Sequence, residues 1–546
     1  MEQIVARLLQ LQHLPVARQE FSERVHTHPD YPSLLAVADV LDSFGVNQSV
    51  AQVADEQLAE VGFPYLAYLE RGSGELVLIR SAAELAVARA EPAQWSGILL
   101  RVEGMRTPPS EEQLAAYRQE RTVTRLARWS GTALSLGLLA VSAYLPSWWT
   151  TALYLLALAG VVIGYLLIGR EVGATPGLIA EFCGGDAQPG CDSVLEADPV
   201  HLFGLYGLPD AVATYFPWQA GLLIAVALAG QPAAGAALLL AGLALAGPVV
   251  ILASIYYQVV VVKAWCRLCL VVDGILGLQA VVALLAFSQQ QVTLRALSLP
   301  TQLFAGGGLL VLTGGLLALK QVLLRQQATR QEKRALLRTK NSVPLFTTLL
   351  QQQSRADDWE FNQEMVFGAA DAPIDIIMVS NPYCVPCQRT HAQLDRLLAL
   401  FPELIKVRLR LTGSNADVGR FPTTTQYVLQ HWLTHVRGQE DECLRTAEML
   451  RAWYHTMNLD SFAATHPADF TGDYSSSTHL LTRHYAWNRQ QGITRTPTLF
   501  VNGYLLPPGY AAEQLVLLLP GLAEYFLTQE QIQQPVFAEA ATYSKQ

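Results

Sequence analysis

The chain has 546 residues, of which 51% are hydrophobic and only 15% are charged, and its formal net charge is -9. This length exceeds one ordinary domain, and the bias toward apolar residues is typical of membrane proteins. The net negative charge gives no indication of a nucleic-acid partner. We therefore expect a multidomain membrane protein.

Residues 1–120 are polar with short amphipathic stretches, and their first 20 lack the long apolar stretch of a cleavable secretion signal. "HTHPDYPSLLAVADVLDSFGV" and "FPYLAYLERGSGELVLIR" resemble the cysteine peptidase domain of bacteriocin-exporting ABC transporters, which has a papain-like α+β fold. Such a peptidase needs a thiolate activated by a histidine. The chain has no cysteine before Cys183, and Glu75 stands where the histidine is expected. The resemblance therefore implies a catalytically inactive domain that binds peptide or steers substrate.

Residues 129–320 are expected to form the membrane part. A spanning helix needs about 20 apolar residues. The first apolar run, 129–169, is roughly twice that length and has "YLPSWWT" in its middle, so it predicts two helices. Further runs follow at 211–229, 233–262, 268–287 and 303–319. We expect an all-α bundle of about six spans.

Two cysteine pairs belong to this membrane part. Cys183 and Cys191 lie in a polar loop between the second and third expected spans, close enough in the sequence for a loop disulfide. Cys266 and Cys269 form a Cys-x-x-Cys at the start of the fifth span. Because the third span crosses the membrane and the fourth returns, we expect both pairs at the same face.

Asp273 lies one turn beyond this second pair in an otherwise apolar helix. An ionisable group is costly inside a membrane and is therefore often functional. The alternative interpretation is an interfacial or bundle-facing aspartate that pairs with a neighbouring side chain. Both interpretations place Asp273 beside the dithiol.

Residues 321–350 form a charged, glutamine-rich segment with a helical pattern, and we expect the helix to break near Pro344. Residues 351–546 follow as a soluble domain. Its segment "IDIIMVSNPYCVPCQRTHAQLDRLLAL" predicts a buried strand, a short loop and an amphipathic helix that begins at the first of two cysteines.

The position of the first cysteine predicts its role. The dipole at the helix N-terminus favours the thiolate of Cys384 and makes it the nucleophile, and Cys387 one turn later can release what Cys384 has captured. The alternative is a structural zinc pair, which needs two further ligands at finger-like spacing. The sequence offers none there, so we expect no metal site.

"GITRTPTLFVNGYLL" places a Thr-Pro before an apolar strand and an Asn-Gly hairpin turn. With the dithiol helix, this resembles the thioredoxin superfamily, in which a cis-proline lies beside the dithiol, and Pro497 occupies that place. More than a hundred residues separate Cys387 from Pro497, and their helical pattern resembles the helical insertion of the DsbA-like branch. In this domain we expect Cys443 to be a sheltered core thiol and His391 to be a surface residue.

The membrane part carries a second resemblance. A loop cysteine followed by Cys-x-Ser-Val-Leu, an "FG" near a Gly-x-Pro and a later Cys-x-x-Cys resemble the vitamin K epoxide reductase family, in its bacterial form fused to a thioredoxin-like domain. The resemblance covers residues 149–320 and extends through the thioredoxin-like part. It implies that the membrane dithiol reduces a quinone, either menaquinone or ubiquinone. It also implies that the loop pair shuttles electrons to that dithiol.

Carried over residue by residue, the resemblance assigns a role to each cysteine. Cys191 would exchange with Cys384, Cys183 would pass electrons to Cys266, and Cys269 would face the quinone. Asp273 stands where the family usually places a polar residue that binds the quinone oxygen.

We therefore expect a thiol-disulfide oxidoreductase that uses quinone as acceptor and forms disulfide bonds in exported proteins with reduced cysteines. One alternative is an isomerase or reductase that passes electrons toward its substrates. A peptidase or exporter component would need the missing nucleophile and a phosphate-binding loop that the sequence lacks. A scaffold with purely structural disulfides is disfavoured because Cys-x-x-Cys pairs at helix starts are poor staples.

The expected location is the bacterial inner membrane, with the cysteine-bearing domains in the periplasm, where disulfides form and persist. The distribution of positive charge points the other way, because cytoplasmic loops carry the excess of Lys and Arg. Arg295 is nearly alone on the opposite face. The residues that flank the cysteine-bearing face are Arg121, Arg125, Arg128, Arg170, Lys263, Arg267 and Lys320.

Overall fold

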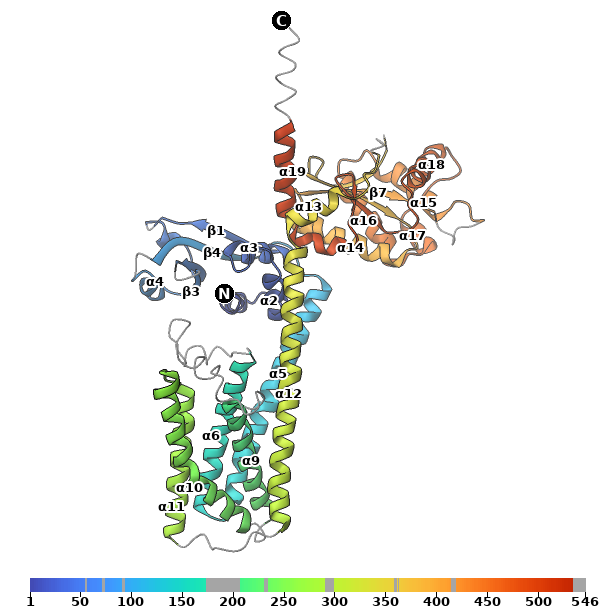
Figure 1. Ribbon diagram of the computed structural model, residues 1–546. Coiled ribbons are helices and arrows are strands. Elements are labelled where there is room, and N and C mark those ends of the chain that lie inside the picture. The colour runs from blue at the N-terminus through green and yellow to red at the C-terminus, as the bar shows by residue number, and fades with distance from the viewer. Residues whose placement is uncertain are drawn as a thin grey trace. The chain divides into compact units, whose positions relative to one another are not determined.

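The computed structural model describes residues 1–54, 56–70, 74–90, 94–172, 207–229, 234–289, 299–357, 361, 363–413 and 419–533 (Figure 1). The chain divides into two compact units. One unit combines Met1–Arg121 with Lys333–Gln546, and the other comprises Thr122–Glu332.

The N-terminal domain packs three helices and a fourth, short one with an antiparallel sheet in the order β1-β4-β2-β3. Its core consists of side chains such as Phe21, Leu41, Leu66 and Leu100, which come from both helices and strands. The domain is therefore α+β, as predicted, and its papain-like topology stays a prediction. The elements are α1 (Glu2–Leu11), α2 (Arg18–His26), α3 (Leu34–Ser43), β1 (Val46–Gln52), η1 (Leu58–Glu60), β2 (Tyr65–Leu69), β3 (Glu75–Ile79), α4 (Ala82–Ala88) and β4 (Trp95–Met105).

The C-terminal domain is built on a five-stranded sheet in the order β5-β7-β6-β8-β9. Strands β6 and β7 pair in parallel across helix α14, and the other neighbours are antiparallel. Strand β6 is buried at almost every position, because it is the central strand of the sheet. The elements are β5 (Met365–Gly368), β6 (Ile374–Ser380), α14 (Val385–Leu400), β7 (Ile405–Leu411), β8 (Thr498–Val501) and β9 (Tyr504–Leu505).

Helical segments fill the chain between β7 and β8, which confirms the predicted helical insertion. They bury three tryptophans, Trp432, Trp453 and Trp487, in the same core as the sheet. The turn between β8 and β9 is formed by Asn502 and Gly503, both with positive φ, as the Asn-Gly hairpin predicts. The insertion consists of α15 (Thr424–His431), η8 (Trp432–Val436), α16 (Glu442–Thr456), α17 (Leu459–Thr465) and α18 (Ser475–Gln490), and η9 (Ala512–Leu517) and α19 (Leu519–Gln533) follow the sheet.

The N-terminal domain contacts the C-terminal end of α14 within the same unit. The Arg396 guanidinium donates to the carbonyl oxygens of Phe44 (3.2 Å) and Pro108, and Arg106 donates to the carbonyl oxygen of Leu400 (2.8 Å). The bonds to Phe44 and Leu400 satisfy carbonyl groups that the ends of α3 and α14 leave without partners in the helix. The N-terminal domain is therefore docked against the C-terminal end of the helix that carries the dithiol.

The second unit is a helix bundle (Figure 1). Five of the described helices are long and apolar enough to cross a membrane, namely those that cover Trp148–Glu171, Leu208–Leu228, Leu238–Val262, Arg267–Ser288 and Gln302–Lys340. A short break separates α5 from α6, as the predicted division of the first run requires. The apolar end of α5, 129–141, is shorter than a full span, so six spans are not shown. The elements are α5 (Glu111–Val141), η3 (Ser142–Tyr144), α6 (Trp148–Glu171), α9 (Leu208–Ala229), α10 (Ala234–Tyr256), η6 (Tyr257–Val262), α11 (Arg267–Ser288) and α12 (Leu299–Lys340).

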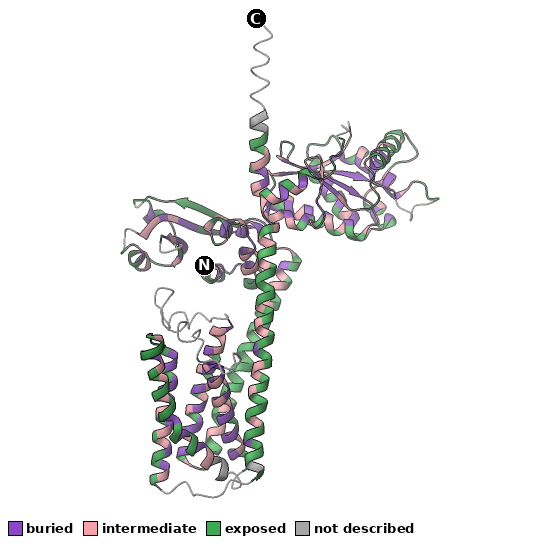
Figure 2. Cartoon of the chain, viewed as in Figure 1, coloured by how far each residue is buried: buried purple, intermediate pink, exposed green. Residues whose placement is uncertain are grey.

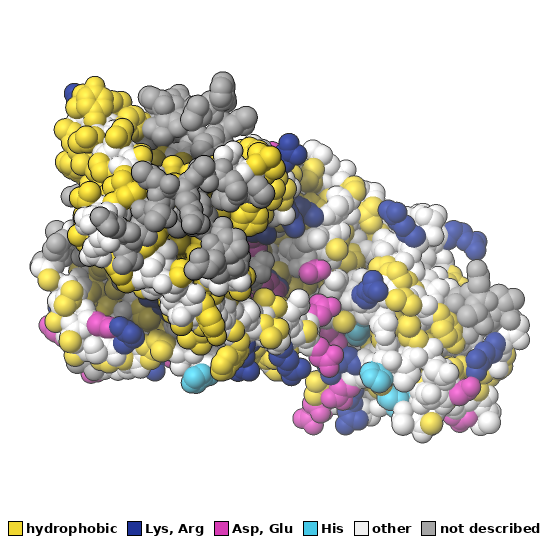
Figure 3. Space-filling model, turned by 90° about the horizontal axis from the view of Figure 1, so that it is seen from below, with side chains coloured by type: hydrophobic (Ala, Val, Ile, Leu, Met, Phe, Trp, Pro, Cys, Tyr) yellow, Lys and Arg dark blue, Asp and Glu magenta, His cyan; other side chains and the backbone are white. Residues whose placement is uncertain are grey.

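The outer faces of these helices are apolar and exposed (Figure 2), and yellow hydrophobic side chains gather over the bundle in Figure 3. A surface of this kind is stable in lipid and not in water. Helix α12 continues to Lys340, and α13 (Val343–Gln351) begins with Pro344 in its first turn. The predicted helix break near Pro344 is therefore confirmed.

Two glycines bring α6 and α9 into close contact. A Cβ atom at Gly160 would overlap the ring of Phe216, and one at Gly164 would lie 3.0 Å from the Cα atom of Ala213. Small residues four positions apart let membrane helices approach closely. This pair sets the position of Phe216 in the bundle.

Candidate redox sites

The thioredoxin-like dithiol lies at the start of α14. Cys384 is the N-cap residue, and its sulfur accepts a hydrogen bond from the backbone N–H of Cys387 (3.1 Å). The two cysteines form a disulfide, with their Cα atoms 5.1 Å apart. Cys384 is partly exposed and Cys387 is fully buried, so a substrate thiolate can reach only the first sulfur from solvent. This arrangement fits a nucleophile and a resolving cysteine.

Three hydrogen bonds fix the loop before Cys384. The Asn381 side chain accepts from the N–H of Tyr383 (2.9 Å) and donates to the carbonyl of Gly413 (2.9 Å). The Trp453 indole, from the helical insertion, donates to the carbonyl of Pro382 (2.9 Å). The insertion therefore takes part in fixing the reactive loop.

Pro497 lies beside this dithiol. The Thr496–Pro497 peptide bond is cis, and the sulfur of Cys384 lies 3.5 Å from the carbonyl oxygen of Thr496. A groove of about 550 Å³ has Pro497, Thr390 and Tyr510 among its lining residues. The structure thus brings together Cys384, Cys387 and Pro497.

Two expectations for this domain are wrong. His391 is buried, because it packs between Phe367 of the sheet and Tyr454 of the insertion (ring centroids 5.8 and 5.0 Å). Cys443 is exposed in the first turn of α16 and is not a core thiol. Partial desolvation of its sulfur by neighbouring atoms and the negative charge of Glu442 raise the pKa of Cys443, which makes it a weak nucleophile at neutral pH.

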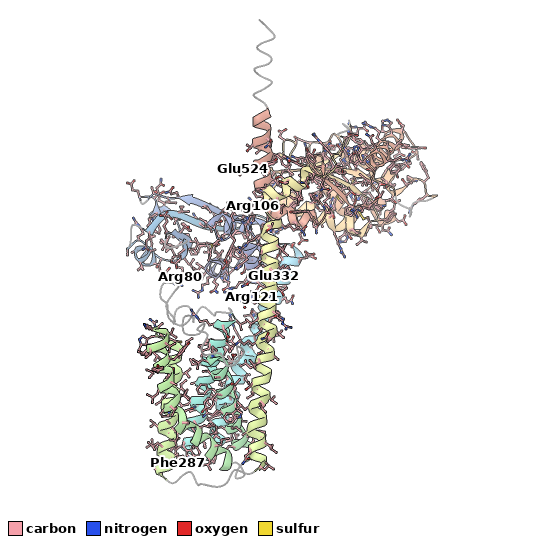
Figure 4. All side chains as sticks on the ribbon, viewed as in Figure 1. Arg80, Arg106, Arg121, Phe287, Glu332 and Glu524 are labelled. Atoms are coloured by element: carbon pink, nitrogen blue, oxygen red, sulfur yellow. A yellow bond between two sulfur atoms is a disulfide. The ribbon has the colours of Figure 1, made fainter. Side chains whose placement is uncertain are left out.

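The membrane dithiol is built in the same way at the start of α11. Cys266 is the N-cap residue, and its sulfur accepts from the N–H of Cys269 (3.2 Å). Both side chains are buried, at 0% and 2% exposure. Phe287, labelled in Figure 4, marks the opposite end of this helix. The dithiol therefore sits at one end of the bundle, closed off from bulk water.

Cys269 lines a cavity of about 310 Å³ between α6, α9, α10 and α11. Its walls are almost entirely aliphatic and aromatic, and they include Tyr215 and Phe216. The polar side chains that line it include Asp273 and Ser254. An apolar cavity with a few convergent polar groups is typical of a small-molecule site.

Asp273 is buried, faces the bundle and lines the cavity, and its functional role stays a prediction. It accepts a hydrogen bond from the Ser254 hydroxyl (2.9 Å), which in turn accepts from the Gln258 side chain (3.1 Å). The Gln258 carbonyl oxygen accepts the N–H of Cys266 (3.0 Å). Sequence reasoning missed Ser254 and Gln258. Their spacing of four residues within an apolar run was the available signal.

The loop cysteines Cys183 and Cys191 lie outside the described residues. Among the described residues, no group of three or more His, Cys, Asp or Glu side chains could hold a metal ion.

The comparisons with known proteins concern both dithiols. The family model for the "Vitamin K epoxide reductase family" matches residues 151–284. These residues form a vitamin K epoxide reductase family domain. The domain includes both membrane cysteines, the wall of the cavity and the loop pair. No curated protein matches the chain.

Several solved structures are similar to the thioredoxin-like part. A periplasmic thioredoxin-like protein from Salmonella enterica serovar Typhimurium is 14% identical and covers 34% of this chain and 97% of its own, with a TM-score of 0.25. ScsC from Proteus mirabilis is 18% identical and covers 36% and 98%, with a TM-score of 0.25. Oxidised BdbD from Bacillus subtilis is 10% identical and covers 32% and 98%, with a TM-score of 0.24.

The family domain and the thioredoxin-like dithiol together support a thiol-disulfide oxidoreductase in a membrane. Each dithiol has one sulfur at a helix N-cap and a second sulfur in the following turn. Their surroundings differ, since one opens to water and the other to an apolar cavity.

Proposed function

We propose that this protein oxidises the thiols of exported proteins and passes the electrons to a membrane quinone. The observation that carries the proposal is the cavity at Cys269, whose apolar walls fit a quinone ring and whose acid, Asp273, can donate a hydrogen bond to a quinone oxygen. Either menaquinone or ubiquinone has this chemistry.

The proposed reaction is a series of thiol-disulfide exchanges. A substrate thiolate attacks Cys384, the Cys384–Cys387 bond breaks, and a second substrate thiol displaces Cys384 and leaves the substrate oxidised. The resulting dithiol reduces the Cys183–Cys191 pair through Cys191, and Cys183 passes the electrons to Cys266.

The last step takes place at the membrane dithiol. Cys266 and Cys269 form one disulfide and lose two electrons and two protons, and the quinone gains both and becomes a quinol. Cys269 is the sulfur at the cavity, so it is the residue that faces the acceptor. Asp273 orients the quinone oxygen.

The proposal places the cysteine-bearing face in the periplasm of the bacterial inner membrane. Lys320, which counts against this orientation in the sequence, is buried in the bundle between Asp210 (2.8 Å) and Glu171 (2.5 Å). Its charge is neutralised inside the protein and does not face lipid headgroups. This pairing weakens the argument for a cytoplasmic orientation.

The test is quinone reduction by the purified protein in detergent, started with a reduced, unfolded cysteine protein. We expect the wild type to turn over with a short-chain ubiquinone or menaquinone. Cys269→Ala and Cys384→Ala should each lose at least about 100-fold in rate, because a single missing sulfur interrupts the exchange series. Cys443→Ala, which removes an exposed cysteine outside both sites, is the matched control and should keep the wild-type rate.

The outcomes separate the steps. If Cys384→Ala oxidises substrate at the wild-type rate, the thioredoxin-like domain is not the point of entry. If Cys269→Ala still reduces quinone, the cavity is not the quinone site and the proposal fails.

A further inference from the structure

A hydrogen-bonded chain joins α10 to α11 through the apolar bundle. It runs from the N–H of Cys266 to Gln258, from Gln258 to Ser254, and from Ser254 to Asp273. Gln258 is 2% exposed and belongs to the π-helical segment η6, where α10 ends. Gln258 thus connects the start of the dithiol helix, through Ser254, to Asp273 in the cavity wall.

The direction of each bond follows from the carboxamide. An amide oxygen accepts and an amide nitrogen donates. Because the N–H of Cys266 is a donor, the Gln258 oxygen faces it, and the Gln258 nitrogen faces Ser254. The Ser254 oxygen accepts that bond, so its own proton is directed to Oδ2 of Asp273. This bond fixes one oxygen of the Asp273 carboxyl group, and Asp273 lines the cavity.

We propose that Gln258 is a positioning residue that sets the dithiol helix and, through Ser254, the Asp273 carboxyl group as one unit. The proposal rests on the proposed quinone reduction and assigns to α10 a role that neither cysteine motif predicts. It predicts that the two bonds of Gln258 act on two separate properties. The bond to Cys266 sets the redox equilibrium of the dithiol, and the bond to Ser254 sets the affinity for quinone.

Three variants separate these two properties. Ser254→Ala removes the donor to Asp273 and leaves the Gln258–Cys266 bond in place. Ser254→Thr keeps a hydroxyl group, and Gln258→Met keeps the volume of the side chain but removes both bonds. Ser288→Ala is the matched control, because the Ser288 hydroxyl, on the same helix as Asp273, is exposed and donates to the carbonyl of Leu285 (2.9 Å).

Two quantities are measured on the full chain in detergent. The first is the KM for a short-chain quinone. The second is the fraction of Cys266 and Cys269 in the disulfide form after equilibration with dithiothreitol buffers, read by alkylation and mass spectrometry. The second readout needs no quinone.

We expect Ser254→Ala to raise the KM for quinone about tenfold, which corresponds to one lost hydrogen bond, and to leave the dithiol equilibrium unchanged. Ser254→Thr should restore the KM to within about twofold, since it restores the bond. Gln258→Met should raise the KM and also shift the equilibrium of the dithiol about fivefold, because the buried N–H of Cys266 loses this acceptor. Ser288→Ala should match the wild type in both.

The proposal is overturned if Ser254→Ala keeps the wild-type KM, if Ser254→Thr is as impaired as Ser254→Ala, or if Gln258→Met leaves the equilibrium unchanged. If the wild type reduces no quinone, the proposed function fails, and the equilibrium alone decides this inference. A shift in Gln258→Met without one in Ser254→Ala would then support it, and the absence of any shift would overturn it.

Discussion

The buried histidines of the thioredoxin-like domain include His391 and His484. Burial and the positive charge of Arg451 lower the pKa of His391 to about 4. Burial together with Arg410 and Arg483 lowers the pKa of His484 to about 3. In the unfolded chain, both would titrate near the usual histidine value of about 6.5.

We expect the domain to lose stability as the pH falls from about 6.5 toward about 4. In this window the unfolded state binds protons that the folded state excludes, whereas above it both states leave the histidines neutral and the full stability is present. His391 should contribute roughly 2 kcal/mol to the difference between about pH 7.5 and about pH 5.

Urea unfolding followed by tryptophan fluorescence at the two pH values measures this difference. His391→Leu should reduce it, and His455→Leu, which removes an exposed histidine, should not. Equal pH dependence in His391→Leu and the wild type would contradict the assignment.

The sequence could predict the place of Cys384 and Cys387 at the start of a helix, because a Cys-x-x-Cys at a helix start is a local pattern. It could not predict the burial of His391. His391 packs against Phe367 of the sheet and Tyr454 of α16, and contacts with elements so distant in the chain cannot be read from the residues of α14 alone. Cys443 was expected in the core but is exposed. Helix α16 buries Ala447, Leu450 and Trp453, whereas its first turn, which carries Cys443, lies outside the core.

At the scale of helices, the contact of α6 with α9 depends on Gly160. We expect Gly160→Ala to destabilise the bundle by about 1–3 kcal/mol, because the added Cβ atom and the Phe216 ring would compete for one space. The thermal unfolding midpoint in detergent should fall by several degrees. The KM for quinone should rise as well, because Phe216 lines the cavity.

Gly242→Ala in α10 is the matched control, since a Cβ atom there has no neighbour within 4 Å. If both glycine variants unfold at the wild-type temperature, close packing at Gly160 does not hold the two helices together.

Helix existence was predictable here, because long apolar runs have few alternatives to membrane helices. The polar contacts inside the bundle were not predictable, because the hydropathy of a run is an average that hides single polar residues. Ser254 and Gln258 do not interrupt the apolar run that became α10 and η6, yet Ser254 donates a hydrogen bond to Asp273 and Gln258 accepts one from the N–H of Cys266.

For the whole molecule, the proposed orientation puts the thioredoxin-like domain on the periplasmic face of the membrane. Cys443 offers a direct readout, because it is exposed on that domain and lies outside both dithiols. In intact spheroplasts, a membrane-impermeant maleimide should label it if the domain is periplasmic. Labelling should be done at mildly alkaline pH, because the raised pKa of this thiol slows the reaction at neutral pH.

Cys443→Ala should abolish this signal. Labelling that appears only after the cells are lysed would place the domain in the cytoplasm and would contradict the proposed orientation.

The two dithiols share one short chain conformation, in which the first sulfur caps a helix and receives the amide of the second cysteine. The difference in their reactivity must therefore come from their surroundings, which decide which molecules can reach each sulfur. Around Cys384, water and polypeptide thiols are admitted to the first sulfur, whereas around Cys269 the cavity admits apolar molecules to the second. In the proposed reaction, electrons would enter the Cys384–Cys387 pair through its first sulfur and leave the Cys266–Cys269 pair through its second. Directional flow can thus arise from which atom of each pair is exposed, without any difference in the motif itself.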